Sequence, residues 1–401
     1  MYAMKRMNND MAVSPIVATL VLIVVAVIGA VAVGTIMGSF STQVSKQANA
    51  GQASTASQTE ILVAGSTTLQ PVEINLASDY AKINPGIQVN VQGGSSGVGV
   101  TAVATGIADI GASSAAAKIT AAQTANPNNP GYQNLYAELI GGRAVAWITN
   151  AASPAVPTGT VNATDLAQAY TTAVGSNGTL PGGNAIGSIA GNAVMVSRSD
   201  SSGTEDDASQ WLFGATSGHI NTSYSVGETG NEGIRAYIAS TAHTLGFCDA
   251  GWALTNPSGI EILNVTDWTA ANTLDSLYTP AVATGTVGET YGAVTNTEMK
   301  DALKDWFFGN AQDHTSSAVA TSGVHNGQQI GNYPQGLVGG MYWITPATVP
   351  TVFTARGTIQ TQGTSAASST VKDLMQFAVS PVEQPAFDNV GDLQINEFAS
   401  T

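Results

Sequence analysis

Charged residues are scarce in this 401-residue sequence: they make up 10% of the chain, and 12 Lys and Arg stand against 27 Asp and Glu. The formal net charge of −15 argues against nucleic acid as a partner, because a phosphate backbone requires a basic protein face. Any site for an anion must therefore be built locally, against an unfavourable overall field.

Cysteine is almost absent as well. Cys248 is the single cysteine, which excludes an internal disulfide and a multi-cysteine metal site, and we expect it to be a small buried side chain. The four histidines (His219, His243, His314 and His325) lie far apart, without a metal-ligand spacing such as HExxH. The sequence therefore predicts no metal site and no cofactor.

Apolar residues and glycine are plentiful by contrast. Hydrophobic residues make up 43% of the chain, which also contains 44 glycines. A disordered acidic chain would have fewer apolar and many more charged residues, so this composition indicates a folded globular protein. A chain of this length can form two lobes, each with its own core.

The N-terminal part contains a long apolar run. Residues 11–45 include no charged residue, and residues 16–37 would form an apolar helix of about 33 Å, enough to cross a bilayer. Lys5 and Arg6 precede this run, which favours a cytoplasmic N-terminus with the bulk of the chain outside. We expect a leader over residues 1–12, a hydrophobic anchor or helix over residues 13–40 and a flexible stalk over residues 41–59.

A succession of strands and helices follows the stalk. Short apolar runs predict strands over residues 60–64, 87–91 and 107–110. Pro71 opens a helical pattern, in which one face is formed by Val72, Leu76, Tyr80 and Ile83. The alternation of strand and helix predicts a parallel sheet covered by helices.

Two strand-to-helix loops are rich in Gly, Ser and Thr: Gly65-Ser66-Thr67-Thr68 and Gly93-Gly94-Ser95-Ser96-Gly97. The first N–H groups of a helix have no partner within the helix and carry a partial positive charge. Glycines let the backbone approach a ligand closely, and hydroxyls add adaptable donors. Such loops can bind an oxyanion without a formal charge.

A later loop adds a cation. The predicted strand over residues 193–196 leads into Ser197-Arg198-Ser199-Asp200-Ser201-Ser202-Gly203-Thr204, and Glu205-Asp206-Asp207 then begins a helix. Arg198 is one of few basic residues outside the N-terminal region, and it lies beside a Ser-Gly-Thr helix start. A guanidinium fork together with backbone and hydroxyl donors suits a tetrahedral oxyanion.

These loops resemble those of the substrate-binding proteins of ABC-type phosphate transporters. The resemblance includes the segments at residues 65–68, 93–97, 107–114 and 198–204, and further segments at residues 230–234, 245–247 and 377–384. It implies a two-lobed periplasmic-binding-protein-like fold of type II that binds inorganic phosphate and delivers it to an ABC permease. The implied phosphate-binding residues are Thr67, Thr68, Ser95, Ser96, Asp109, Arg198, Ser202, Gly203 and Thr204.

The implied role of Asp109 has its own physical logic. A carboxylate repels an anion unless the anion offers a proton. Hydrogen phosphate does so at neutral pH and sulfate does not, so an unpaired Asp109 would discriminate against sulfate.

The segment Met11-Ala12-Val13-Ser14-Pro15-Ile16-Val17, with the apolar run behind it, is similar to the N-terminus of archaeal type IV pilin-like proteins. In those proteins a short leader is clipped before the helix, which then anchors the protein in a membrane or packs into a filament. We expect membrane anchoring, with self-assembly through the helix as the alternative. Cleavage after Ala48-Asn49-Ala50, which would release the chain, is a further alternative.

Two other classes of function stay open. Gly93-Gly94-Ser95-Ser96-Gly97 fits the GxSxG pattern of serine hydrolases, but that hypothesis leaves Arg198 unexplained, and we expect no enzyme. A structural pilin or adhesin that uses the binding-protein fold would suit the four glycosylation sequons at Asn162, Asn177, Asn221 and Asn264. Binding of a different oxyanion is the third alternative.

The sequence thus predicts an α/β protein of two lobes preceded by a single hydrophobic helix. Residues 60–144 with residues 330–401 are expected to form lobe 1, and residues 145–329 lobe 2. The expected function is capture of phosphate at the cell surface, with the bulk of the chain extracytoplasmic.

Overall fold

The computed structural model describes residues 59–171, 180, 183–213, 220, 225–266, 290–308, 333–353 and 359–399. The predicted leader, hydrophobic helix and most of the stalk lie outside these residues, as do the sequons at Asn177 and Asn221 and three of the four histidines (His219, His314 and His325). In the described part, no helix has the length and apolarity needed to cross a bilayer.

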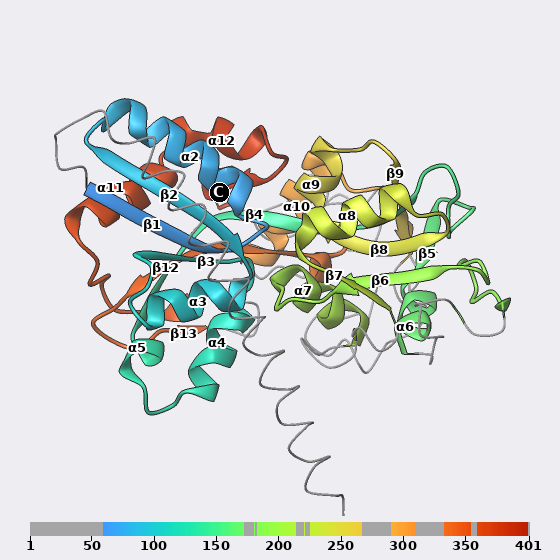
Figure 1. Cartoon of the computed structure of the whole chain (residues 1–401), viewed down its shortest axis with the longest axis horizontal. Helices are drawn as coiled ribbons and strands as arrows, with labels where there is room; N and C mark the ends of the chain where they lie inside the picture. Colours follow the sequence, from blue (N-terminus) through green and yellow to red (C-terminus); the bar gives the residue numbers. More distant parts are fainter. Residues whose placement is uncertain are drawn as a thin grey trace, which may run out of the picture. The chain divides into compact units, whose positions relative to one another are not determined.

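A mixed sheet forms the centre of the described fold, with strand order β2-β1-β3-β12-β4-β8-β6-β7 (Figure 1). β1 (Thr59–Ser66) pairs in parallel with β2 (Ile87–Gly94) and with β3 (Ile110–Ser113), as the alternation of elements predicted. β12 (Val338–Pro346) is antiparallel to β3 and to β4 (Leu135–Asn150). The three strands from which the sequence predicted a parallel sheet are thus parallel, and β12 makes the sheet as a whole a mixed one.

Helices cover both faces of this first half of the sheet. α2 (Gln70–Ile83), α11 (Ser369–Ala378) and α12 (Gln384–Asp388) lie on one face, and α3 (Ser96–Ala104), α4 (Ala116–Ala125) and α5 (Pro130–Gln133) lie on the other (Figure 1). α2 has Pro71 in its first turn and buries Val72, Leu76 and Tyr80, as predicted. Ile83, predicted on the same face, is 63% exposed because it is the last residue of the helix.

The strand β4 exchanges one partner for another along its length. It pairs with β12 through Ala144 and with β8 (Thr244–Asp249) from Val145 onward. β6 (Val194–Arg198) and β7 (Val226–Glu228) extend the sheet in parallel beyond β8. The helices of this second half are α6 (Ala163–Thr171), α7 (Gly203–Phe213), α8 (Gly230–Ser240) and α9 (Ala250–Thr255).

Shorter elements complete the described part. β9 (Ile260–Ile262) and β15 (Leu393–Gln394) both pair with β4. A three-stranded sheet consists of β5 (Thr160–Asn162), β10 (Asn264–Thr266) and β11 (Thr290–Tyr291), and β13 (Val352–Phe353) pairs with β14 (Ile359–Thr361). The remaining helices are α10 (Asn296–Phe308), η2 (Gln335–Leu337), η3 (Pro381–Glu383) and α13 (Ile395–Phe398).

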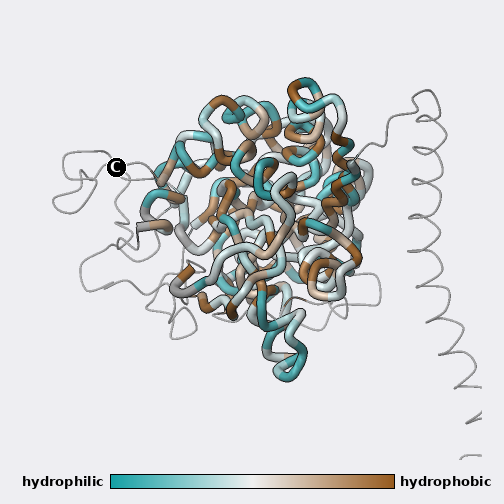
Figure 2. Tube along the Cα trace, turned by 90° about the vertical axis from the view of Figure 1, so that its left-hand side faces the viewer, coloured by the Kyte–Doolittle hydropathy of each residue, from teal (hydrophilic) through white to brown (hydrophobic). Residues whose placement is uncertain are grey.

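The apolar core does not divide where β4 changes partner. One cluster lies beneath α2, α11 and α12, but the larger one runs from α3 and α4 along β4 into the second half. There Trp147 packs edge-on against Phe247, with ring centroids 5.3 Å apart, and Cys248 is fully buried beside them, as predicted. Hydrophobic and hydrophilic residues alternate along the described elements (Figure 2). The larger cluster is therefore shared by the two halves of the sheet, and the division into two lobes stays a prediction.

β3 begins later than the sequence predicted. Gly106 has φ +72° and ends α3, and the N–H groups of Ile107 and Ala108 both donate to the carbonyl oxygen of Ala102. Ile107 is 63% exposed. The run at residues 107–110 thus lies mostly in the loop that follows α3, and the strand proper covers Ile110–Ser113.

Candidate oxyanion-binding site

The candidate site lies where the parallel strands β1, β2 and β3 end. Ser66, Gly94 and Ser113 are their last residues, and α2, α3 and α4 begin shortly after them. Since the strands are parallel, their carboxyl ends share one edge of the sheet, the usual position of ligands in open α/β sheets.

Two glycines bring α3 into contact with this edge. Gly65 has φ +146°, and a Cβ there would lie 2.3 Å from the Ala112 carbonyl oxygen. A Cβ at Gly99, in α3, would lie 2.4 Å from the same oxygen. The helix therefore packs directly on the strand backbone, which places the serines at its N-terminus beside the end of β3.

Three buried serines form a cluster there, which we call the hydroxyl cluster: Ser66, Ser96 and Ser114. Ser66 Oγ donates to Ser114 Oγ at 3.1 Å, Ser96 Oγ lies 3.1 Å from Ser114 Oγ, and the Ser114 N–H donates to Ser96 Oγ at 3.1 Å. Each is 3% exposed or less. Ser66 and Ser114 were not among the predicted site residues, although each stands at the end of a parallel strand, and that position is a signal in the sequence.

Arg143 hydrogen bonds with the backbone of Ser114, the residue that follows β3. Its Nε donates to the Ser114 carbonyl oxygen at 3.1 Å, and its Nη2 donates to the same oxygen. Nη2 also forms an ion pair with Asp207 Oδ2 at 2.7 Å, and the Arg143 side chain is fully buried. Arg143 was not among the predicted site residues, and its signal is a lone cation within the long, largely apolar strand β4.

Arg198, the last residue of β6, approaches from the second half of the sheet. Its Nε and Nη2 donate to the Asp200 carboxylate at 2.7 and 2.6 Å, and its Nη2 lies 3.4 Å from Thr67 Oγ1. Arg198 is only 4% exposed. The cation predicted from the loop is therefore buried, paired with a carboxylate and in contact with the first Ser/Thr loop.

The start of α7 completes the arrangement. Thr204 Oγ1 lies 3.1 Å from Thr68 Oγ1, and Ser202 Oγ accepts from the Glu205 N–H at 3.2 Å. A Cβ at Gly203 would lie 2.5 Å from Ser114 Oγ, so only glycine fits against the hydroxyl cluster. Ser202, Gly203 and Thr204 thus lie beside Thr68 and Ser114, as expected for residues of one site.

Asn231 connects the two sides and was not predicted. Its Nδ2 donates to Thr68 Oγ1 at 2.8 Å, while its Oδ1 accepts from Arg198 Nη1 at 3.3 Å and from the Asp249 N–H at 3.0 Å. It follows Gly230, which has φ +72° and lies against Thr67. The segment at residues 230–234 belonged to the family resemblance, without an assigned role.

Asp109 does not join these residues. It is exposed, its Oδ2 accepts from the Leu62 N–H at 2.9 Å, and its own N–H donates to the Leu62 carbonyl at 3.0 Å. Ser66 is the last residue of β1 and lies about 13 Å beyond Leu62 along the strand, at about 3.3 Å per residue. The prediction that Asp109 contacts the anion is therefore corrected: because β3 begins at Ile110, Asp109 precedes the strand and lies at its opposite end.

The acidic residues at the start of α7 are buried or half-buried and carry altered pKa values. Burial raises the pKa of Asp206 to about 7, against the opposing effect of Lys118, whose Nζ lies 2.9 Å from Asp206 Oδ1. Burial likewise raises the pKa of Glu205 to about 7, although it accepts from the Arg198 N–H at 3.0 Å. Since Lys118 belongs to α4, its ion pair joins the first half of the sheet to α7.

Ser95 has a structural role in the described part. It is the N-cap of α3, and its Oγ accepts from the Val98 N–H at 3.3 Å. His243 is the histidine that the described ranges include, and it directly precedes β8. Among the described residues other than glycine, it is the one with a left-handed backbone, at φ 58°. No hydrogen bond links these two residues in the described part, so the hydrolase hypothesis gains no support from their geometry.

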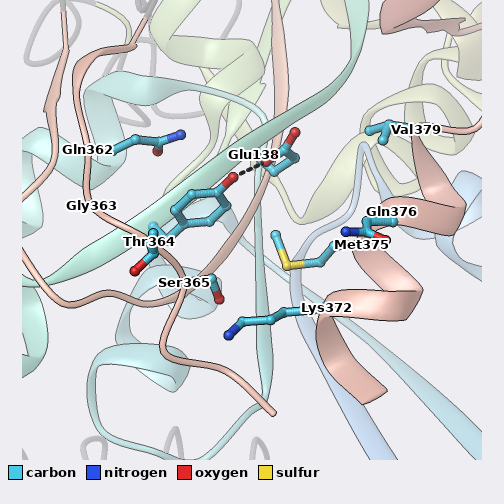
Figure 3. Close-up of a pocket in the computed structure, with 10 residues that line it drawn as sticks. Glu138, Gln362, Gly363, Thr364, Ser365, Lys372, Met375, Gln376 and Val379 are labelled. Atoms are coloured by element: carbon cyan, nitrogen blue, oxygen red, sulfur yellow. Dashed lines mark hydrogen bonds between the residues drawn. The ribbon is translucent and has the colours of Figure 1, made fainter. Parts of the chain in front are cut away.

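A pocket of about 610 Å³ lies elsewhere, between β4, α11 and the segment before α11 (Figure 3). Tyr136 Oη donates to Glu138 Oε2 at 2.5 Å on one side, and Lys372 and Met375 of α11 line the other (Figure 3). Burial, together with Glu138, raises the pKa of Tyr136 to about 12. None of the predicted site residues lines this pocket, so its volume alone does not make it the candidate site.

Comparisons with known proteins agree with this fold. A protein from Clostridium perfringens, described as a phosphate ABC transporter substrate-binding protein and solved with bound phosphate, is 14% identical with a TM-score of 0.51, over 84% of this chain and 99% of that one. An ABC-type phosphate transport receptor from Vibrio cholerae is 16% identical with a TM-score of 0.45, over 83% and 99% of the two chains. No curated protein matches the chain. The family model described as the PBP superfamily domain matches residues 50–380, and the chain therefore belongs to that superfamily.

Proposed function

We propose that this chain is an extracytoplasmic solute-binding protein that captures inorganic phosphate for an ABC-type importer. One observation carries the proposal: the hydroxyls of two strand-to-helix loops meet Arg198 and the start of α7 at one edge of the sheet. Seven of the nine residues predicted from sequence lie in or beside this group, and an eighth, Ser95, is the N-cap of the neighbouring helix α3.

The chemistry of this group suits a tetrahedral oxyanion. The starts of α2, α3 and α7 supply N–H groups and the positive ends of helix dipoles. Arg198 supplies the positive charge, and the hydroxyls of half-buried Thr67 and of buried Thr68, Ser96 and Thr204 supply further donors. We favour phosphate as the ligand because the similar Clostridium perfringens protein was solved with bound phosphate.

We further propose that the chain acts as two lobes that close on the ligand. Residues 60–144 with residues 330–401 would form one lobe and residues 145–329 the other. In support, β4 changes partner between Ala144 and Val145, and the Thr68–Thr204 and Lys118–Asp206 contacts join the two sides. A hinge at such a crossing is the usual means of closure in binding proteins.

Calorimetry with the purified full-length chain in mild detergent tests the function. Phosphate should bind with 1:1 stoichiometry, and a buffer injection gives the baseline. Arg235 provides a matched control: it donates to the carbonyls of Asn256 and Ser258, so R235Q should retain binding whereas R198Q should not. Absence of phosphate binding by the folded wild-type chain would reject the proposal.

The proposal includes a tether. Residues 13–40 would anchor the chain in the membrane and residues 41–59 would form the stalk, with the bulk outside the cell next to the permease. Cell fractionation after gentle shearing tests this attachment: the intact chain should be recovered in the membrane fraction. Recovery in pelleted filaments would indicate self-assembly through the helix, and recovery as a soluble chain beginning near Gly51 would indicate signal cleavage; either result contradicts the tether.

A further inference from the structure

We infer that the candidate site distinguishes a tetrahedral oxyanion by shape and charge but not by its proton, so that it binds sulfate as well as phosphate. The inference rests on the proposed function and concerns the selectivity of the same site. It follows from the partners of the site's hydroxyls and from the partners of the carboxylates near the site.

The hydroxyls of the site have no carboxylate partner among the described residues. Ser66, Ser96 and Ser114 hydrogen bond with one another and with backbone N–H groups. Thr68 hydrogen bonds with Thr204 and Asn231. The one ionised partner of a site hydroxyl in this part of the chain is the Arg198 guanidinium, which is a donor.

The carboxylates near the site are already engaged. Asp200 accepts from Arg198 through both oxygens and from the Gly230 N–H at 3.2 Å. Glu205 accepts from the Arg198 backbone N–H, and Asp206 pairs with Lys118. Asp109, which sequence alone indicated as the proton acceptor, lies at the other end of β3.

One main-chain acceptor at the hydroxyl cluster is occupied as well. The carbonyl oxygen of Ser114 accepts from both Nε and Nη2 of Arg143. The side-chain acceptors of the cluster itself are hydroxyl oxygens. A hydroxyl rotates and can either donate to a bare anionic oxygen or accept from a protonated one.

This flexibility has a consequence for selectivity. An ionised carboxylate in contact with the anion rejects sulfate, because sulfate has no proton to offer and is repelled. A hydroxyl at the same position imposes no such penalty. The site should therefore accept any tetrahedral oxyanion of similar size and charge.

Calorimetry of the full-length chain against phosphate and against sulfate tests the inference. We expect the dissociation constant for sulfate to lie within about tenfold of that for phosphate. Phosphate binding with sulfate binding more than about a hundredfold weaker would overturn the inference and leave the proposed function intact. Binding of neither anion would overturn the proposed function, and this inference with it.

Substitution of Ser114 tests whether the lack of a carboxylate at the hydroxyl cluster is the reason that sulfate is accepted. S114D places an acceptor-only carboxylate in the hydroxyl cluster and should increase the preference for phosphate over sulfate by about tenfold or more, whereas S114N, of the same size and neutral, should not. An equal preference in S114D and S114N would show that Ser114 does not face the anion and would overturn this cause. If S114D does not fold, the ratio of the sulfate and phosphate dissociation constants of the wild-type chain decides the inference by itself.

Discussion

The hydroxyls of Thr68 and Thr204 lie 3.1 Å apart although 136 residues separate them along the chain. Thr68 stands just before α2, and Thr204 is in the first turn of α7. The contact joins two helix starts that belong to different halves of the sheet. Substitutions on either side should therefore change the affinity for one shared ligand.

Arg198→Ala should weaken phosphate binding by about 2–5 kcal/mol, because it removes the charge-assisted donor and leaves Asp200 without its cationic partner. Arg198→Lys should recover only part of this loss, since an ammonium cannot replace the planar fork. Calorimetry of both variants measures the effect. An affinity of Arg198→Ala equal to that of the wild type would contradict a role for Arg198 in the site.

The Lys118–Asp206 ion pair should stabilise the fold through a coupling of about 0.5–3 kcal/mol in a double-mutant cycle of K118M and D206N. Its side chains are 18% and 5% exposed, so the pair is shielded from water. The pair Lys82–Asp79, exposed at 70% and 38%, is the control and should show no measurable coupling in denaturant unfolding. Equal coupling in the two cycles would contradict the role given to burial.

Gly99→Ala should lower both stability and anion affinity. Its Cβ would lie 2.4 Å from the Ala112 carbonyl oxygen and would push α3, with Ser96, away from the strands. Overpacking of this kind costs roughly 1–3 kcal/mol. Gly86→Ala is the matched control, because a Cβ there meets nothing within 4 Å. Thermal unfolding and calorimetry should separate the two variants, and an unaffected Gly99→Ala would show that the contact is not tight.

Glu73→Gln should make stability less dependent on pH. Burial raises the pKa of Glu73 from its ordinary 4.5 to about 8, against the opposing effect of the 2.7 Å hydrogen bond from Trp343 Nε1. The folded chain then holds a proton that the unfolded chain releases, so this contribution to stability is present below pH 4.5 and is lost as pH rises towards about 8.

The glutamine keeps the acceptor for Trp343 and stays neutral. Relative to the wild type, the variant should gain at least about 1.4 kcal/mol between pH 5 and pH 9, the equivalent of one pKa unit. Urea unfolding at several pH values measures this, with E232Q, at an exposed position of α8, as the control. A difference between E73Q and wild type that stays constant with pH would show that Glu73 does not titrate in this range.

Much of the first half of the fold could be predicted from local signals. The spacing of Val72, Leu76 and Tyr80 specifies α2, and the Gly/Ser/Thr loops mark the ends of β1 and β2. Arg198 could be recognised because cations are so rare in this chain. These signals depend only on residues close together in sequence.

The errors arise where tertiary packing, and not the local sequence, determines the structure. The apolar residues at 107–110 resemble a strand, yet two of their N–H groups cap α3, and this shift moves Asp109 out of the site and Ser114 into it. Arg143 and Asn231 act through partners far away in sequence, which no local pattern contains. The continuity of the larger core along β4 could not be predicted for the same reason.

β4 gives the two parts of the sheet a strand in common. Residues up to Ala144 hydrogen bond with β12, and residues from Val145 onward hydrogen bond with β8. If β4 detaches, both parts lose a central strand at once, so its opening amounts to global unfolding. Local unfolding is then expected only at peripheral strand pairs such as β13 and β14. If the two sides move against each other on ligand binding, as proposed, β4 still ties them into a single cooperative unit for unfolding.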